Sequence, residues 1–126
     1  MKLSRRQAIF FLQLFIIAVF ILSLITAIRF KKTFQDARNL IRLHHLEAIM
    51  DAVYTYYIVH HTFPDCIPLS GAVKIQECQE IEPFLTKLPK DPSSDGEYFI
   101  EYFGPEKNNI RVFSTSKEAL GLEIIR

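Results

Sequence analysis

The chain has 126 residues, with 15 Lys and Arg side chains against 14 Asp and Glu side chains, so its formal net charge at pH 7 is +1. A nucleic-acid-binding protein gathers basic side chains into a patch that faces the phosphates. The lysines and arginines of this chain are not gathered into such a patch with interleaved aromatic residues. We therefore expect no nucleic acid partner. About 98 residues remain after the apolar segment described next, which is enough for one small domain.

The chain opens with a basic leader at residues 1–8, which contains Lys2, Arg5 and Arg6, and continues into an apolar run at residues 9–28. A helix of about 20 residues rises ~1.5 Å per residue and so matches the ~30 Å hydrocarbon core of a bilayer. A secretory signal has a shorter apolar region that ends in a small-residue cleavage site, whereas this run ends at a second basic cluster. The sequence therefore predicts a transmembrane helix that is retained.

Residues 29–63 predict an amphipathic helix that continues the transmembrane helix without a break. Neither glycine nor proline occurs between residues 9 and 63. Apolar side chains recur at helical spacing on one predicted face and polar side chains on the other; the apolar set is Leu43, Leu46, Met50, Val53 and Tyr57. We expect the helix to end near Thr62 or Phe63, because Pro64 disfavours helical geometry in the residue before it. The aromatic residues at this end are predicted to pack rather than to stack on a ligand.

The two cysteines, Cys66 and Cys78, both lie after the predicted helix. A bridge between them would close a loop of ~13 residues and contribute roughly 3 kcal/mol, in a region of about 63 residues whose core alone is marginal. We predict a disulfide in preference to two reduced cysteines, and a zinc site is disfavoured because no CxxC pair is present. Because disulfides persist outside the cytoplasm, we expect a cytoplasmic amino terminus and an extracytoplasmic carboxy-terminal head.

The head is predicted to span residues 64–126. An irregular loop is expected first, followed by two strands at residues 97–103 and 110–114 that form a hairpin. A third strand at residues 122–125 would complete a small antiparallel sheet. The predicted fold class is therefore α+β: one long amino-terminal helix, half transmembrane and half amphipathic, packed against a small antiparallel sheet.

No catalytic motif is present, and we expect no enzyme activity, cofactor or metal. Asp91 and Asp95 flank a proline-rich turn, but two carboxylates are too few for calcium, which takes six to eight ligands, so we interpret them as turn-forming residues. The histidine pairs at residues 44–45 and 60–61 lie ~24 Å apart along a helix and cannot share a metal ion.

This order of elements resembles the type IV pilin-like proteins, which include the pseudopilins of type II secretion systems. The resemblance covers nearly the whole chain: a short basic leader, an apolar segment that runs into an amphipathic helix, and Phe63-Pro64 where such proteins often have Tyr-Pro. The sequence LPKDP at residues 88–92, followed by a strand with Tyr98-Phe99, looks like the major-pseudopilin branch. The resemblance implies a pilin-like fold and a structural subunit that assembles through its amino-terminal helix.

The family's leader is cut by a prepilin peptidase after a glycine and before a phenylalanine, which then becomes the methylated amino terminus, and the fifth mature residue is a glutamate. Here the resemblance places the cut between Ala8 and Ile9, and Gln13 stands at the fifth mature position. In the family the glutamate is thought to attract the amino terminus of a neighbouring subunit. The resemblance thus implies an assembly role for Gln13, while a polar residue near the headgroup end of an ordinary anchor is an equal interpretation.

Two functions follow as expectations. The first is a subunit of a type IV pilus or of a type II secretion pseudopilus, whose partners are the membrane, other pilin-like subunits and the prepilin peptidase. The second is an uncleaved single-pass membrane protein whose extracytoplasmic pilin-like head binds or senses a surface partner.

Overall fold

A computed structural model describes residues 5–106, 109–119 and 121–126. The first half of the predicted leader and two residues of the predicted hairpin loop, Lys107 and Asn108, lie outside these ranges. The chain divides into two compact units, one that ends at Asp36 and one that comprises Ala37–Arg126, and each is described by itself. The main elements of the described residues are one long amino-terminal helix and a four-stranded antiparallel sheet, so the predicted α+β fold class is confirmed.

Helix α1 spans Arg5–His60. It ends because His61 adopts the left-handed conformation, with φ of 60°, while its N–H donates to the carbonyl oxygen of Tyr57 at 2.7 Å. A left-handed residue directly after the last helical turn is a common helix terminator. The predicted end near Thr62 or Phe63 lies two to three residues beyond the observed one, because the backbone turns at His61 before Pro64 can act.

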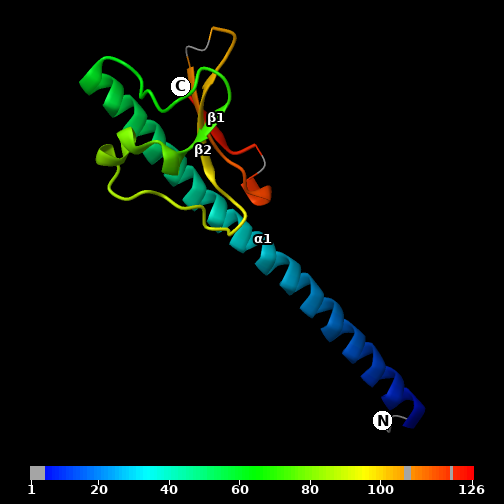
Figure 1. Cartoon of the computed structure of the whole chain (residues 1–126). Helices are drawn as coiled ribbons and strands as arrows, with labels where there is room; N and C mark the ends of the chain where they lie inside the picture. Colours follow the sequence, from blue (N-terminus) through cyan, green and yellow to red (C-terminus); the bar gives the residue numbers. More distant parts are fainter. Residues whose placement is uncertain (1–4, 107–108, 120) are drawn as a thin grey trace. The chain divides into compact units, whose positions relative to one another are not determined.

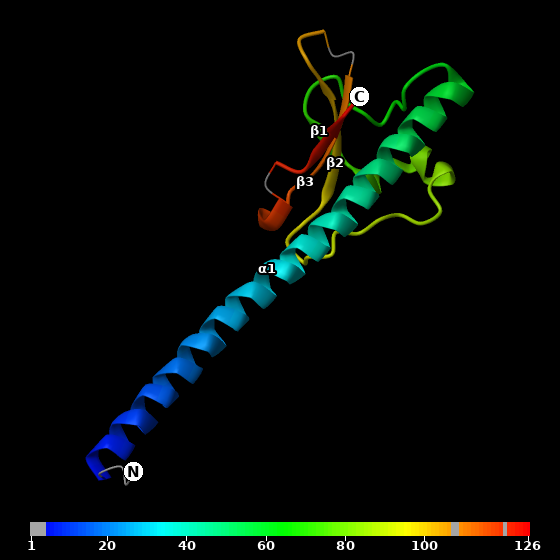
Figure 2. The same ribbon diagram turned by 180° about the vertical axis from the view of Figure 1, so that it is seen from behind.

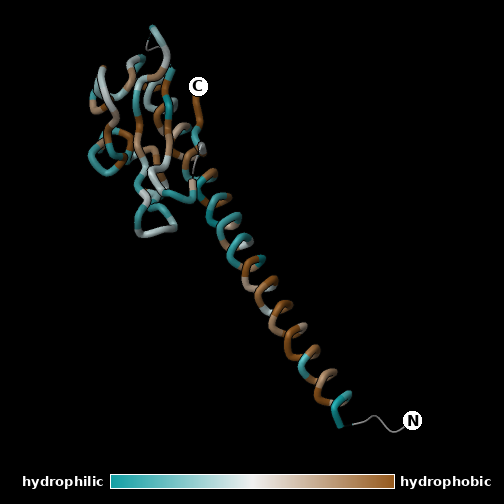
Figure 3. The backbone as a smooth tube through the Cα atoms, turned by 90° about the vertical axis from the view of Figure 1, so that its right-hand side faces the viewer, coloured by the Kyte–Doolittle hydropathy of each residue, from teal (hydrophilic) through white to brown (hydrophobic). Residues whose placement is uncertain are grey.

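In the first unit, α1 is long and apolar enough to cross a membrane. The apolar part of this helix is mostly brown in Figure 3, with one teal turn near its amino-terminal end, and its side chains are exposed within the described chain. This agrees with the predicted span at residues 9–28, since a span buries its side chains in lipid and not in its own protein.

In the second unit, the sheet has the strand order β1-β2-β3-β4, with every neighbouring pair antiparallel. The strands are β1 Ala72–Lys74, β2 Tyr98–Phe103, β3 Asn109–Ser114 and β4 Glu123–Ile125. The predicted hairpin corresponds to β2 and β3, and β4 confirms the third predicted strand. Strand β1 lies in a stretch predicted to be a loop. It forms because its three residues pair with β2, with Val73 opposite Ile100. A strand of three residues is too short to show an alternating hydrophobic pattern in the sequence.

The core lies between α1 and the inner face of the sheet (Figures 1 and 2). Alternate residues of β2 and β3 point to this face and are fully buried: Tyr98, Ile100, Ile110 and Val112. From α1, the fully buried apolar side chains are Leu46, Ile49, Met50 and Val53. The predicted stripe is thus confirmed at its centre and wrong at its ends, because Leu43 and Tyr57 are 36% and 41% exposed.

The segment between α1 and β2 adds further side chains to this core. It contains two short 3₁₀ helices, η1 Ile75–Glu77 and η2 Gln79–Phe84, and a disulfide joins Cys66 to Cys78 with Cα atoms 5.2 Å apart, as predicted. Cys78 and Ile81 are buried in the same core as the helix. A third 3₁₀ helix, η3 Lys117–Ala119, lies between β3 and β4.

Aromatic rings gather where α1 ends. Phe63 stacks on Tyr57 with ring centroids 4.7 Å apart and meets Tyr54 and Tyr102 edge to face. Tyr56 contacts the ring of Phe84 in η2 at 5.9 Å. The predicted packing role of these aromatic residues is confirmed, because their rings contact one another across elements.

Candidate functional site

The first candidate site is the apolar surface of α1 in the first unit. Its large side chains are exposed by about half or more, for example Ile9 by 51%, Phe15 by 66% and Phe20 by 64%. Monomeric soluble proteins rarely expose so continuous an apolar surface, and such surfaces mark contacts with lipid or with other proteins. We therefore expect lipid or another protein to cover this surface.

The hydroxyl groups on this surface are satisfied within the helix. Ser23 donates to the carbonyl oxygen of Phe20 at 2.7 Å, and Thr26 donates to those of Leu22 and Ser23 at 3.1 and 2.8 Å. Serine and threonine make such bonds back to the preceding turn. In hydrocarbon an unpaired polar group costs several kcal/mol, so these two residues suit a lipid environment without any partner.

Gln13 differs from these residues. It is exposed on the same helix, and among the described residues its amide has no hydrogen-bond partner. A buried amide needs a partner, because transfer into an apolar medium without one costs roughly 2–7 kcal/mol. In an apolar surrounding, Gln13 would therefore need a hydrogen-bond partner from outside the chain.

Ala8 and Ile9 both lie in the first two turns of α1 and are exposed. Ile9 is four residues before Gln13, so the two residues share one face of the helix. Cleavage between Ala8 and Ile9 stays a prediction.

The second candidate site is a buried ion pair in the second unit. The guanidinium of Arg42 donates from Nε and Nη2 to the carboxylate of Asp91, at 3.0 and 2.9 Å, and neither side chain is exposed at all. Burial alone would raise the pKa of Asp91, but hydrogen bonds from Arg42, Ser114 and Ser93 outweigh it and hold that pKa well below its usual range. The carboxylate therefore stays ionised and the pair stays charged.

Arg42 also holds groups from other parts of the head. Its Nη1 donates to the side-chain oxygen of Asn39 at 2.7 Å, and its Nη2 lies 2.7 Å from Ser93 Oγ and 3.0 Å from Ser116 Oγ. Beside it, Arg38 Nε donates to Glu118 at 2.7 Å, and this bond is the main reason that the pKa of Glu118 is lowered. One turn of α1 thereby holds the turn after Asp91 and the η3 segment.

The sequence interpretation missed Arg42, although a signal was present. Arg42 precedes Leu46 by four residues and so continues the buried face of the helix, where an arginine requires an acidic partner. The turn-forming role predicted for Asp91 is correct but incomplete: the N–H of Ser93 donates to Asp91 Oδ1 at 2.9 Å, which is turn chemistry, while the same carboxylate pairs with Arg42.

The histidines do not come together. His44 is exposed, His45 contacts Tyr98, and His60 packs on the ring of Tyr56 with centroids 4.3 Å apart. Within the described ranges, no group of three or more His, Cys, Asp or Glu side chains is arranged to hold a metal ion.

Comparison of the chain with models of protein families, with curated proteins and with solved structures finds no match.

The Arg42–Asp91 pair predicts a large effect on stability. Replacing Arg42 by Met leaves the carboxylate of Asp91 buried without its cation, so we expect the free energy of unfolding to fall by about 3–5 kcal/mol. The matched control is Arg38→Met, which breaks a partly exposed pair and is expected to cost about 0–1 kcal/mol. Urea unfolding of the full chain in mild detergent, followed by circular dichroism, measures both. Equal losses in the two variants would contradict a dominant role for the buried pair.

The same pair predicts how stability depends on pH. The pKa of Asp91 is lower in the folded state than in the unfolded state, where it is about 3.9, so the unfolded state binds the proton more tightly. The contribution of Asp91 is present above about pH 4 and is lost as the pH falls further towards the folded-state pKa. We expect Asp91→Asn to be less stable than the wild type at pH 7 and to lose less stability between about pH 4 and pH 2. A parallel decline of both proteins in this window would exclude Asp91 as the titrating group.

Proposed function

We propose that this protein is a structural subunit of a pilin-like filament, either a type IV pilus or a type II secretion pseudopilus, which assembles through the first unit of α1. The observation that carries the proposal is Gln13, an amide without a partner on an apolar helix surface whose other polar groups, Ser23 and Thr26, satisfy themselves. An anchor that only crosses lipid satisfies such a group only at headgroup level, where water reaches it. A bundle of helices can supply the missing partner.

The proposed assembly works by packing and not by a chemical reaction. Apolar helices from several subunits lie side by side and bury the surface that a single chain leaves exposed. Small interhelical hydrogen bonds of this kind contribute about 0.6–2 kcal/mol in membranes. If the leader is cut after Ala8, the new amino group of Ile9 becomes a donor, and the side-chain oxygen of Gln13 on a neighbouring helix is a suitable acceptor.

The head takes part as a rigid body on the second part of α1. Arg42 and Arg38 hold the carboxy-terminal segment and the turn after Asp91 against the helix. A head fixed in this way transmits its position to the helix that carries it, which a subunit of an ordered filament requires. The surface of the head then sets the contacts to neighbouring subunits or cargo.

A second candidate function is an uncleaved single-pass membrane protein whose head binds or senses a partner outside the cytoplasm. The residues around the expected cleavage position favour it, because Ala8, Ile9 and Gln13 all depart from the pilin pattern of Gly, Phe and Glu. In this case Gln13 lies near the headgroup level, where water satisfies its amide.

Amino-terminal sequencing of the protein extracted from membranes separates the two functions. We expect the mature chain to begin at Ile9, with a methylated amino group, when expressed together with a prepilin peptidase. Ala8→Leu is the matched variant and should retain its leader, because a bulky residue replaces the small one before the cut. A chain that begins at Met1 in the unaltered protein would favour the uncleaved anchor.

The assembly role of Gln13 can be tested against a self-satisfied residue of the same helix. Gln13→Leu removes the proposed interhelical hydrogen bond, so we expect crosslinked oligomers in membranes to decrease about three- to thirtyfold, as a bond of this size implies. Ser23→Leu is the control and should leave oligomers nearly unchanged, because Ser23 bonds within its own helix. Equal assembly of the two variants would contradict the proposed role of Gln13.

The proposed topology places the head outside the cytoplasm, which the Cys66–Cys78 disulfide supports. We expect a membrane-impermeant reductant followed by an impermeant maleimide to label both cysteines in spheroplasts. Labelling should be absent without reduction. Thiols that react only after lysis would place the head in the cytoplasm and reverse the orientation.

A further inference from the structure

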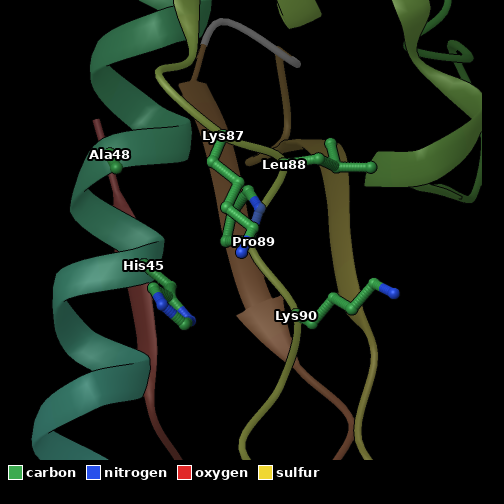
Figure 4. Close-up of a pocket in the computed structure, with 6 residues that line it drawn as sticks. All are labelled: His45, Ala48, Lys87, Leu88, Pro89 and Lys90. Carbon is green, nitrogen blue, oxygen red and sulfur yellow. The ribbon is translucent and has the colours of Figure 1, made fainter.

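A cavity of about 290 Å³ lies in the second unit between α1 and the segment that leads into the LPKDP turn. Its volume is close to the lower end of the range of ~300–1,000 Å³ in which small molecules bind. Figure 4 shows the side chains that line it: His45, Ala48, Lys87, Leu88, Pro89 and Lys90. Neither of the proposed functions uses this cavity.

The imidazole of His45 is held in one orientation by a buried tyrosine. Tyr98 is fully buried, and its hydroxyl lies 2.8 Å from His45 Nδ1, with the two rings edge to face. A buried hydroxyl needs an acceptor, and Nδ1 is its partner among the described residues. Tyr98 therefore donates to Nδ1, and the proton of the neutral imidazole is on Nε2.

The charge states of both rings agree with this arrangement. Burial raises the pKa of Tyr98, so the phenol keeps its proton and remains a donor. Burial likewise lowers the pKa of His45, so the imidazole is neutral at pH 7. The result is an N–H at Nε2 whose direction is fixed and which has no partner among the described residues.

Lys87 supplies a charge beside this donor. In Figure 4 the imidazole of His45 and the side chain of Lys87 both extend into the space between α1 and the Pro89 backbone, whereas the ammonium of Lys90 points away. Lys87 is exposed and forms no ion pair with any described carboxylate. Ala48 and Pro89 add apolar walls. One cation and one neutral donor therefore line the same cavity, beside an apolar surface.

We propose that this cavity binds a carboxylate attached to a small apolar group, with one oxygen accepting the Nε2–H of His45 and the other facing the ammonium of Lys87. A monoanion matches the one charge of Lys87, since the ammonium of Lys90 points away, and the apolar walls cover the hydrocarbon part of the ligand. The carboxylate comes from an acidic side chain of another protein or from a free carboxylic acid. The site holds for either proposed function, because it depends only on the head.

The full chain, labelled with ¹⁵N-histidine and held in detergent micelles, tests the site directly. We expect sodium butyrate to shift the imidazole resonances of His45 and not those of His44, which is exposed on the same helix. Butyramide has the same shape without the charge and should bind at least about tenfold more weakly, since charged hydrogen bonds are the stronger class. No shift at His45, or equal binding of butyrate and butyramide, would overturn the proposal.

Two lysine variants show whether the charge acts at the place proposed. Lys87→Gln should weaken butyrate binding about tenfold, while Lys90→Gln should leave it nearly unchanged, because its ammonium points out of the cavity. Both residues are exposed and neither is part of the core, so both variants should fold, which circular dichroism verifies. Equal effects of the two substitutions would indicate non-specific attraction and would reject the site.

Comparing butyrate with a second ligand shows whether the bound carboxylate belongs to a protein side chain or to a free acid. N-acetylglutamate methylamide presents a glutamate side chain between two blocked peptide groups. Tighter binding than butyrate supports a protein side chain as the natural occupant, and weaker binding supports a free acid. Failure of both to bind overturns the site, while cleavage of the leader and assembly through Gln13 can still succeed, so the two sets of results are separable.

Discussion

The buried ion pair between Arg42 and Asp91 is the interaction on which the rest of the head depends. A guanidinium removed from water is tolerated only when its charge and its N–H groups are all satisfied. Here a carboxylate, an amide and two serine hydroxyls from separate segments do so. Because these partners come from the turn before β2 and from the end of β3, satisfying one side chain fixes both segments on the helix that carries the core residues Leu46 and Ile49.

Helix α1 meets two different demands along its length. In the second unit its apolar face is covered by the chain's own sheet, and its arginines find carboxylates within the head. In the first unit the apolar side chains are exposed on every side, and the hydroxyls of Ser23 and Thr26 are satisfied locally. The first unit thus requires a surrounding that the chain does not supply, either lipid or other helices. The proposed function requires other helices, which would supply a hydrogen-bond partner for Gln13.

The arrangement of the cavity beside His45 depends on a residue of the core. Tyr98 is a core residue of β2, yet its hydroxyl reaches the helix and orients the imidazole. A polar group at the end of a buried aromatic side chain usually finds a partner, and here the partner is a residue that faces the surface. The packing of the core thereby sets the direction of a donor in the cavity, and the adjacent segment brings Lys87 to the same place.

The sequence by itself determined the features that depend on neighbouring residues. The unbroken helix, the apolar span, the β2–β3 hairpin and the Cys66–Cys78 disulfide all follow from local patterns, spacing or composition. Only the tertiary structure decided the Arg42–Asp91 pair, the short strand β1 and the contact between His45 and Tyr98. Their partners are 49, about 27 and 53 residues apart in the chain, and periodicity along one segment carries no information about which distant side chain will satisfy a buried charge or hydroxyl.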